Sequence, residues 1–342
     1  MRDVAKLAGV ATMTVSRVLN DSAPVTEDTR ARVRLAIRQL NYKPNPVARS
    51  LRQAKSNSIG IIVPNFYDPF FAMCAHAISL VAKKYGYSIS VTISDENADV
   101  EFSEASLMVA HHVEGLIVIP ASVGRSRLNQ SEFHGTHIVT LDRPVKGQRF
   151  NSVLVDNRNG VRVAVEHLIE HGHRRIAFLG LAKKLYTFEQ RFAGFRDAMM
   201  GAGLTPGPYG MCRTEDETCA LIQKELSGSD APTAFFLGNN LLMRHALHSF
   251  LRLGVRIPED VAIVGFDDFD MADIFTPSIT VVRQPSQELG RVAGELLFAR
   301  LSAKEVSLSG QQITLPVDFA IRESCGCKGA IGNSHHRVSA QA

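Results

Sequence analysis

The sequence predicts an α/β protein with a small all-helical unit at its N-terminus. From Ile59 onward, short apolar segments alternate with longer helical segments, a pattern that specifies parallel sheets with helices on both faces. Residues 3–20 instead show the apolar spacing of two short amphipathic helices. With 342 residues, the chain has room for two α/β lobes after this unit.

The two N-terminal helices have the spacing of a helix-turn-helix. Gly9 lies between them, where a tight turn needs a residue that tolerates positive φ. The expected inner positions are Val4, Leu7 and Ala8 in the first helix and Val15, Val18 and Leu19 in the second. The expected outward side chains of the second helix are Thr12, Met13, Thr14, Ser16 and Arg17. Such polar groups can approach base edges in a DNA major groove, although the same spacing also fits a helical packing module.

A third helix is predicted from Thr26, as its N-cap, to Leu40. Its expected buried positions are Val33, Ala36, Ile37 and Leu40. Arginines occupy the other side, and they are either solvated or in contact with phosphates: Arg30, Arg32, Arg34 and Arg38.

The charge of the chain is divided unevenly. Residues 1–55 carry 11 Lys and Arg against 4 Asp and Glu, whereas the remainder carries 27 against 30. A basic head on a slightly acidic body is typical of a protein in which one module contacts phosphates. A membrane-surface patch would give the same count, but the apolar stripes of this head are used in its own small core.

Composition also bounds location and cofactors. No apolar run approaches the length of a transmembrane helix, and the N-terminus begins with a charged helix, so we expect a cytoplasmic protein. The five cysteines are scattered, as expected for free thiols. Cys325-Gly-Cys327 has the spacing of half a metal site or of a redox pair, but no other ligand cluster of suitable spacing lies beside it in the sequence. We therefore expect neither a metal nor a cofactor.

The head matches a known family residue by residue. DVAKLAGV-x-x-x-TVSRVLN, then TR-x-x-V-x-x-A-I-x-x-L-x-Y-x-PN and VARSLR, resembles the headpiece of the lac repressor (LacI/GalR) family over about fifty residues. The resemblance implies sequence-specific binding of operator DNA. Ala11 stands where the family has a serine cap on the recognition helix, so Thr12 is the expected substitute.

VARSLR resembles the hinge helix of the family, which orders only on DNA. Leu51 matches the leucine that wedges into the minor groove, although a linker residue packed on the core is the alternative. The resemblance adds further DNA contacts to the outward residues of the second helix: Asn20, Tyr42, Asn45, Ala48, Leu51 and Arg52.

The resemblance also implies a two-lobed core of the periplasmic-binding-protein type I fold, with a ligand between the lobes. The expected division is a helix-turn-helix headpiece (1–45), a hinge helix and linker (46–56), an effector-binding and dimerisation core (57–325) and a disordered tail (326–342). Within the core, lobe one would comprise about 57–155 and 283–317, and lobe two about 156–282 and 318–325.

Several core segments resemble family motifs around the effector. VPNFYDPFF resembles V-P-x-x-x-N-P-F-F, with Asp68 where Asn is usual, and FLGNN stands where the family has an Asn-Asp pair, so that Asn240 departs from it. EQRFAGF resembles R-x-x-G-F, whose arginine commonly grips the effector. The implied effector-binding residues are Phe70, Asp142, Arg143, Thr187, Arg191, Asn239 and Asp267. A structural ion pair or helix cap is the alternative for each.

Taken together, the resemblance implies a repressor that binds a palindromic operator as a homodimer, since the tail lacks leucine heptads. Its effector would be a sugar, a sugar acid or a sugar phosphate. Lys183 and Lys184 near the cleft mouth favour an acidic one unless they are a solvated surface pair.

Two other classes compete with the repressor. A solute-binding protein of the same core fold conflicts with the basic head and the lack of an export signal. An enzyme would need catalytic residues, and the sequence contains no catalytic motif that we can identify; Asp267-Asp268, the nearest candidate, fits a ligand clasp better.

Overall fold

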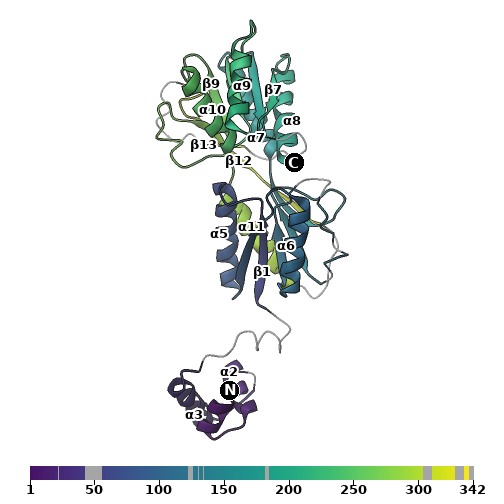
Figure 1. The fold of residues 1–342 in the computed structure, drawn as a ribbon, viewed down its shortest axis with the longest axis vertical. Helices are drawn as coiled ribbons and strands as arrows, with labels where there is room; N and C mark the ends of the chain where they lie inside the picture. The colour runs from purple at the N-terminus through teal and green to yellow at the C-terminus, as the bar shows by residue number, and fades with distance from the viewer. Residues whose placement is uncertain are drawn as a thin grey trace. The chain divides into compact units, whose positions relative to one another are not determined.

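The computed structural model describes residues 1–21, 23–42, 56–121, 126–129, 131–133, 135–181, 185–302, 310–327 and 335–338 (Figure 1). The chain divides into two compact units, Met1–Ser56 and Asn57–Ala342, and each is described by itself. None of the helices in the described ranges is long and apolar enough to cross a membrane.

The first unit is a group of short helices around a small apolar core. Its helices are α1 (Arg2–Ala8), α2 (Thr12–Asn20) and α3 (Glu27–Gln39). Gly9 ends α1 with φ 63°, as the tight turn before α2 requires. The buried residues of the core are Val4, Ala5, Ala8, Val15, Val33 and Ala36.

Some expected core positions of the first unit are wrong. Leu7 is 52% exposed, and Ala5 is buried instead because it lies about 200° around the helix from Leu7. Leu40 is also exposed, since it follows the last residue of α3. Val18, Leu19 and Ile37 pack against the core but are only partly buried.

The helix caps of this unit also differ from expectation. Ala11 is the N-cap of α2, so Thr12 is already the first helical residue and does not replace the missing serine. Thr26 is the N-cap of α3, as predicted, but its hydroxyl bonds to the hydroxyl of Thr29 and not to a backbone N–H.

The second unit has two lobes, each built on one sheet (Figure 1). In lobe one the strands are parallel in the order β11-β5-β4-β3-β1-β2. These strands are β1 (Ser58–Val63), β2 (Ser88–Ile93), β3 (Gly115–Val118), β4 (His137–Leu141), β5 (Asn151–Val155) and β11 (Gln312–Leu315). The helices of lobe one are α5 (Pro69–Lys84), α6 (Ala98–Ala110) and α11 (Ser286–Ser302).

The sheet of lobe two has the order β13-β12-β10-β9-β8-β6-β7 and is parallel except where β12 pairs with β10 and β13. Its strands are β6 (Ile176–Gly180), β7 (Tyr209–Met211), β8 (Ala234–Leu237), β9 (Ala262–Phe266), β10 (Thr280–Arg283), β12 (Val317–Ala320) and β13 (His335–Val338). Its helices are α7 (Asn157–Glu170), α8 (Tyr186–Gly201), α9 (Glu215–Leu226) and α10 (Asn240–Leu253).

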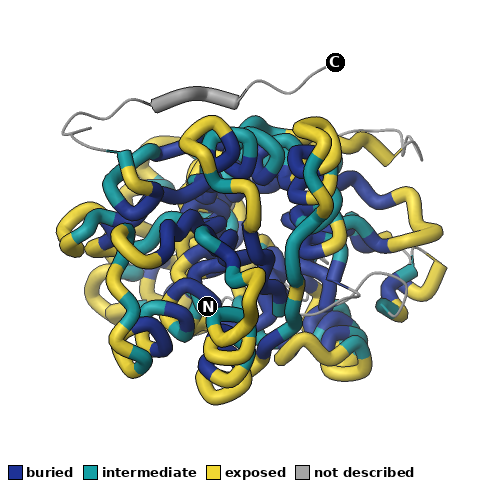
Figure 2. Tube along the Cα trace, turned by 90° about the horizontal axis from the view of Figure 1, so that it is seen from above, coloured by how far each residue is buried: buried dark blue, intermediate teal, exposed yellow. Residues whose placement is uncertain are grey.

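The chain passes between the lobes after β5, after β10 and after β11. These connections place the ends of strands from both sheets on the two sides of one cleft. In both lobes the inner strands are buried, while β2, β7 and β11 are partly exposed, and the helices have exposed residues on their outer faces (Figure 2).

The predicted alternation of strands and helices is confirmed. The apolar pattern of the sequence predicts strands over 88–93 and 137–141 and a helix over 240–253, and β2, β4 and α10 have these bounds. Alternation did not predict the short strands β7 and β10 to β13. The prediction of a disordered tail over residues 326–342 is wrong for 335–338, which form β13 and pair with β12. Backbone pairing to an open sheet edge needs little apolar signal in the added strand.

Gly194 lies where the backbones of α7 and α8 are close together, and only a residue without a Cβ fits there. A Cβ at Gly194 would lie 2.0 Å from the backbone oxygen of Arg158 in α7. Gly201, at the end of the same helix, would place its Cβ in open space.

We expect Gly194→Ala to lower the free energy of unfolding by roughly 2 kcal/mol or more, because backbone atoms must move apart. Gly201→Ala is the matched control and should raise it by up to about 1 kcal/mol, since alanine loses less entropy in a helix. Urea unfolding of both variants measures this, and an unchanged midpoint for Gly194→Ala would contradict the close packing.

Candidate functional site

A cavity of about 170 Å³ lies between the lobes of the second unit. It is lined by all seven residues that the family motifs indicated: Phe70, Asp142, Arg143, Thr187, Arg191, Asn239 and Asp267. Lys183 and Lys184 lie outside the described residues. The motifs therefore selected side chains that the fold brings together from segments far apart in the sequence.

The carboxyl ends of parallel strands position most of these groups, as expected for a doubly wound sheet. Asp142 follows β4, Asn239 follows β8 and Asp267 follows β9. Asp142 and Asp267 have φ of 66° and 76°, a left-handed conformation that non-glycine residues rarely adopt. Backbone strain of this kind concentrates at functional sites, where the surrounding structure maintains it.

The guanidinium of Arg143 is held by hydrogen bonds to neighbouring side chains and to a backbone carbonyl. Its guanidinium donates two hydrogen bonds to Glu96, at 2.7 and 2.8 Å, and one to the carbonyl of Pro120 at 2.8 Å. Its Nε lies 3.2 Å from Oδ2 of Asp142. Arg143 thus orients the Asp142 carboxylate, and burial raises the pKa of that carboxyl.

Arg191 is fixed from the other lobe. It donates from Nε to Oδ1 of Asn157 at 2.8 Å and from Nη1 to the carbonyl of Gly238 at 2.7 Å. Its guanidinium lies 3.7 Å from the centroid of the Phe266 ring. Burial lowers the pKa of Arg191, so its positive charge is costly in the cavity as described.

Asp267 is the most perturbed carboxyl of the cavity. Burial raises its pKa to about 6, although Arg191 acts in the opposite direction. Nε2 of Gln284 donates to Oδ1 of Asp267 at 2.5 Å, whereas Nη1 of Arg191 is 3.9 Å from Oδ2. The ion pair is therefore too long to offset the loss of hydration.

Two acceptors in the cavity have no hydrogen-bond partner among the described residues: Oδ1 of Asp142 and Oε1 of Gln284. Both are buried. Because buried polar atoms are nearly always hydrogen-bonded in folded proteins, these two oxygens are suited to donor groups of a bound molecule.

One contact across the cleft was missed from the sequence. Nδ2 of Asn240, at the start of α10, donates to Oδ1 of Asp68 at 3.0 Å. The same carboxylate caps α5 by accepting from the backbone N–H of Phe70. The sequence indicates Asp68 and Asn240 only as two separate departures from family motifs. An acid in place of an amide at one position, and an amide in place of an acid at the other, is the signal that could have predicted the contact.

Other lining residues also escaped the sequence analysis, namely Asn65, Glu96, Phe188, Arg244, Phe269 and Gln284. Asn65 occupies an unspecified position of the V-P-x-x-x-N-P-F-F pattern, and the others lie outside the quoted motif strings. Asn239 was found, and it also accepts from the backbone N–H of Leu242 as the N-cap of α10.

In the first unit, α2 presents part of the predicted DNA-binding set. Thr12, Met13 and Arg17 are exposed, and Thr14 is half-buried. Ser16 is only 6% exposed, so its predicted outward orientation is wrong: it follows Val15 on the side of α2 that faces the core.

The remaining predicted DNA contacts are only partly described. Tyr42 packs against the small core of the head. The side chain of Asn20 and all of Asn45, Ala48, Leu51 and Arg52 lie outside the described residues. Of the arginines on α3, Arg30 bonds to Asp21 at 2.7 Å and Arg32 lies 3.3 Å from Asp28.

Comparison with known proteins connects the two units. Residues 1–45 match the family model "Bacterial regulatory proteins, lacI family", and residues 165–325 match "Periplasmic binding protein-like domain". The HTH-type transcriptional repressor PurR of Haemophilus influenzae (strain PittEE) is 32% identical over 332 residues, which are 95% of this chain and 98% of the relative. PurR of Aliivibrio salmonicida (strain LFI1238) is 31% identical over 308 residues, covering 89% and 92% of the two chains.

Solved structures agree with these relatives. A lac repressor dimer bound to operator and the anti-inducer ONPF has a TM-score of 0.81 at 26% identity, with 94% of this chain and 98% of that chain covered. The transcriptional regulator CelR in complex with cellobiose has a TM-score of 0.69 at 28% identity, with the same coverage.

A helix-turn-helix unit followed by a two-lobed core with a polar cleft defines a ligand-responsive DNA-binding regulator of transcription. The chain belongs to the lacI family of bacterial regulatory proteins. It is a DNA-binding transcriptional repressor with an effector-binding core, and the solute-binding alternative is not favoured. The relatives are transcriptional repressors, and nothing in the comparisons points to catalysis.

The raised pKa of Asp267 makes the stability of the core depend on pH. Its folded-state pKa of about 6 exceeds the usual 3.8, so the folded protein binds this proton more tightly than the unfolded chain does. The contribution of this proton to the free energy of unfolding is therefore complete below about pH 4, and it is lost as the pH rises through about 6.

We expect Asp267→Asn, which is neutral at every pH, to raise the free energy of unfolding of the ligand-free protein at about pH 8 by up to about 3 kcal/mol. The gain should fall towards zero near pH 4, as followed by urea unfolding across the range. Asp197→Asn is the control: hydrogen bonding to Arg158 lowers the pKa of Asp197, so this change should bring no gain. A larger gain for Asp267→Asn in acid than at pH 8 would have the wrong sign.

Proposed function

We propose that this repressor binds a palindromic operator as a homodimer in the cytoplasm. Residues 1–45 would hold the DNA-binding head, 46–56 the hinge helix and linker, and 57–325 the core. Within the core, we propose that lobe one comprises about 57–155 and 283–317 and lobe two about 156–282 and 318–325. The solved lac repressor dimer bound to operator supports this arrangement by its similarity over nearly the whole chain.

In the head, we propose that α2 enters the major groove with Thr12, Met13, Thr14 and Arg17, helped by Asn20 and Tyr42. The exposure of Thr12, Met13 and Arg17 supports this role. Ser16, by contrast, would hold α2 on the head. We further propose that residues of the hinge segment contact DNA, with Leu51 entering the minor groove: Asn45, Ala48, Leu51 and Arg52.

In the core, the proposed effector is a neutral polyhydroxylated molecule of the sugar class. The observation that carries this proposal is the pair of buried, unpartnered oxygens on Asp142 and Gln284, which suit ligand hydroxyl donors. Aromatic rings at Phe70, Phe188 and Phe269 can cover the apolar face of a sugar ring. The cellobiose complex of CelR is consistent with this class.

Charge favours a neutral effector over an acidic one. The cavity lining contains one more acidic than basic side chain: Asp68, Glu96, Asp142 and Asp267 against Arg143, Arg191 and Arg244. Arg143 is already neutralised by Glu96 and Asp142. An anionic ligand would therefore face net repulsion from these groups.

We propose that the effector acts by changing how the lobes close. Arg143 belongs to lobe one and Arg191 to lobe two, while Asp68 and Asn240 meet across the cleft. A ligand that bonds to both lobes favours one spacing of the cleft, and through it one arrangement of the hinge.

The first test of DNA binding is selection of a randomised duplex pool by the full chain, followed by sequencing. We expect a palindrome of roughly 16–20 bp and affinity that falls steeply with salt. Arg17→Ala should weaken operator binding about tenfold or more and relax one base preference, since base contacts by arginine are worth about 1–3 kcal/mol.

The control for this test is Arg174→Ala, which removes the same charge from an exposed position of the core. It should leave the selected sequence unchanged. If the wild type enriches no sequence at low salt, the operator-binding proposal is wrong.

The test of the effector site is isothermal titration calorimetry of the full chain with neutral mono- and disaccharides and with acidic sugars. We expect a neutral sugar to bind most tightly, and Asp142→Asn and Arg191→Lys each to weaken it at least about tenfold, because a buried hydrogen-bond partner is lost.

The exposed ion pair of Arg158 and Asp197 supplies matched controls, Arg158→Lys and Asp197→Asn, which should bind like the wild type. Equal loss of affinity in these surface variants would show that the measurement reports folding and not the cavity. Preference for acidic sugars in the wild type would contradict a neutral effector.

A further inference from the structure

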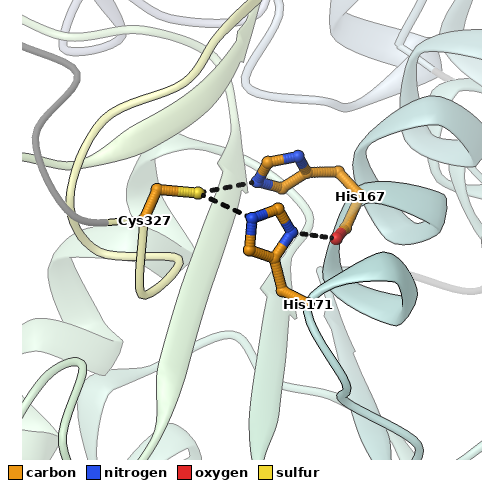
Figure 3. A group of neighbouring side chains, drawn as sticks. All are labelled: His167, His171 and Cys327. Carbon is orange, nitrogen blue, oxygen red and sulfur yellow. Dashed lines mark hydrogen bonds between the residues drawn. The ribbon is translucent and has the colours of Figure 1, made fainter.

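Two histidines and two cysteines meet at the C-terminal end of α7 in lobe two. His167 lies in the last turn of α7 and His171, four residues later, is its C-cap, while Cys325 and Cys327 lie in the turn that follows β12. Figure 3 shows both imidazole rings pointing towards the sulfur of Cys327. The sequence separates these pairs by more than 150 residues, which is why the cysteines alone gave no expectation of a metal.

The spacing of three of these groups suits a metal centre: the ligand atoms of His167, His171 and Cys327 all lie within 4.8 Å of one another. Sγ of Cys327 lies 3.4 Å from Nε2 of His167 and 3.2 Å from Nε2 of His171. Sγ of Cys325 lies 3.3 Å from Sγ of Cys327 and 3.4 Å from Nε2 of His167. A tetrahedral zinc ion with ordinary bond lengths separates sulfur and nitrogen ligands by roughly 3.5 Å and two sulfurs by roughly 3.8 Å. His167, His171 and Cys327 need only small outward movements, and Cys325 is placed to complete the set by its contacts with His167 and Cys327.

The tautomer of His171 is already suited to ligation. Its Nδ1 lies 2.8 Å from the backbone oxygen of His167, an atom that can only accept a hydrogen bond (Figure 3). Nδ1 therefore carries the proton of the neutral ring, and the lone pair is on Nε2, which faces Cys327. A carbonyl that fixes the far nitrogen of a ligating histidine is the usual support of protein metal sites.

The fold holds the other ligands in place as well. Gly326 has φ 88°, which allows the chain to reverse between the two cysteines. Sγ of Cys325 lies 3.3 Å from the hydroxyl of Thr280 and 3.2 Å from the backbone oxygen of Arg322, and these contacts hold the sulfur in position. The ring of His167 packs edge-on against Phe319 at 5.2 Å between centroids.

We propose that His167, His171, Cys325 and Cys327 bind one Zn²⁺ ion. Two thiolates neutralise its charge, and sulfur with imidazole selects zinc over magnesium or calcium. On binding, two metal–sulfur and two metal–nitrogen bonds form and the two thiol protons pass to the buffer. The ion ties the chain after β12 to the end of α7, separately from the effector cavity.

The experiment uses the full chain, purified under reducing conditions, stripped with a chelator and reloaded with Zn²⁺ or Co²⁺. We expect about one metal equivalent per chain by elemental analysis. Co²⁺ should give the intense visible bands of a tetrahedral site, with sulfur-to-cobalt charge transfer. Zinc should also raise the unfolding temperature.

Cys327→Ser and His171→Gln change partly exposed ligands, and each should weaken zinc binding about tenfold or more. The matched controls are Cys219→Ser, a buried thiol elsewhere, and His248→Gln, a surface histidine; both should retain the metal. Circular dichroism shows whether each variant is folded.

Three results would overturn the proposal. One is zinc content that Cys327→Ser and His171→Gln leave unchanged in folded protein. Another is a weak cobalt spectrum of six-coordinate type. The last is an intact mass two hydrogens below that of the reduced chain, caused by a disulfide between Cys325 and Cys327 in the protein as purified.

Discussion

The core of this repressor depends on charged groups buried at the ends of parallel strands. Asp142 and Asp267 leave β4 and β9 in left-handed conformations, and each lies close to an arginine that is itself buried. Removing such charges from water costs several kcal/mol unless hydrogen bonds compensate. Glu96, Asn157 and Gly238 compensate the arginines, but one oxygen of Asp142 and one of Gln284 remain without a hydrogen-bond partner among the described residues. The cavity therefore retains hydrogen-bonding capacity that water or a bound molecule can satisfy.

A second polar contact, between Asp68 and Asn240, joins the two lobes across the cleft. Compared with the family motifs that the sequence resembles, this chain has Asp68 in place of Asn and Asn240 in place of Asp. The exchange keeps one amide and one carboxylate opposite each other, and the hydrogen bond of 3.0 Å shows that the pair still meets. Asp68 also retains its role as cap of α5, because a carboxylate accepts from a backbone N–H as well as an amide oxygen does. Two apparent departures are thus one compensated change.

Local pattern predicted what depends on neighbours in the sequence. Alternating apolar segments located β2, β4 and α10, and Gly9 located the turn in the head. The seven cavity residues came from the family motifs, since spacing alone does not reveal which strand ends face each other. Ser16 was predicted to be exposed but is buried, because apolar residues at helical spacing do not determine how far the buried face of a helix extends. Glu96 and the cluster around Cys327 depend on tertiary contacts with distant segments, for which a single sequence carries no local signal.

Helix α7 brings the effector cavity and the histidine–cysteine cluster into one structural element. Asn157 at its first residue accepts the hydrogen bond of Arg191, while His167 and His171 lie in or just after its last turn. A rigid helix of this length separates the two ends by about 20 Å. Contacts at both ends fix how α7 lies on the sheet, and Gly194 permits α8 to approach it closely. The position of the Arg191 guanidinium therefore depends on the packing of α7 against α8 as well as on its own hydrogen bonds to Asn157 and Gly238.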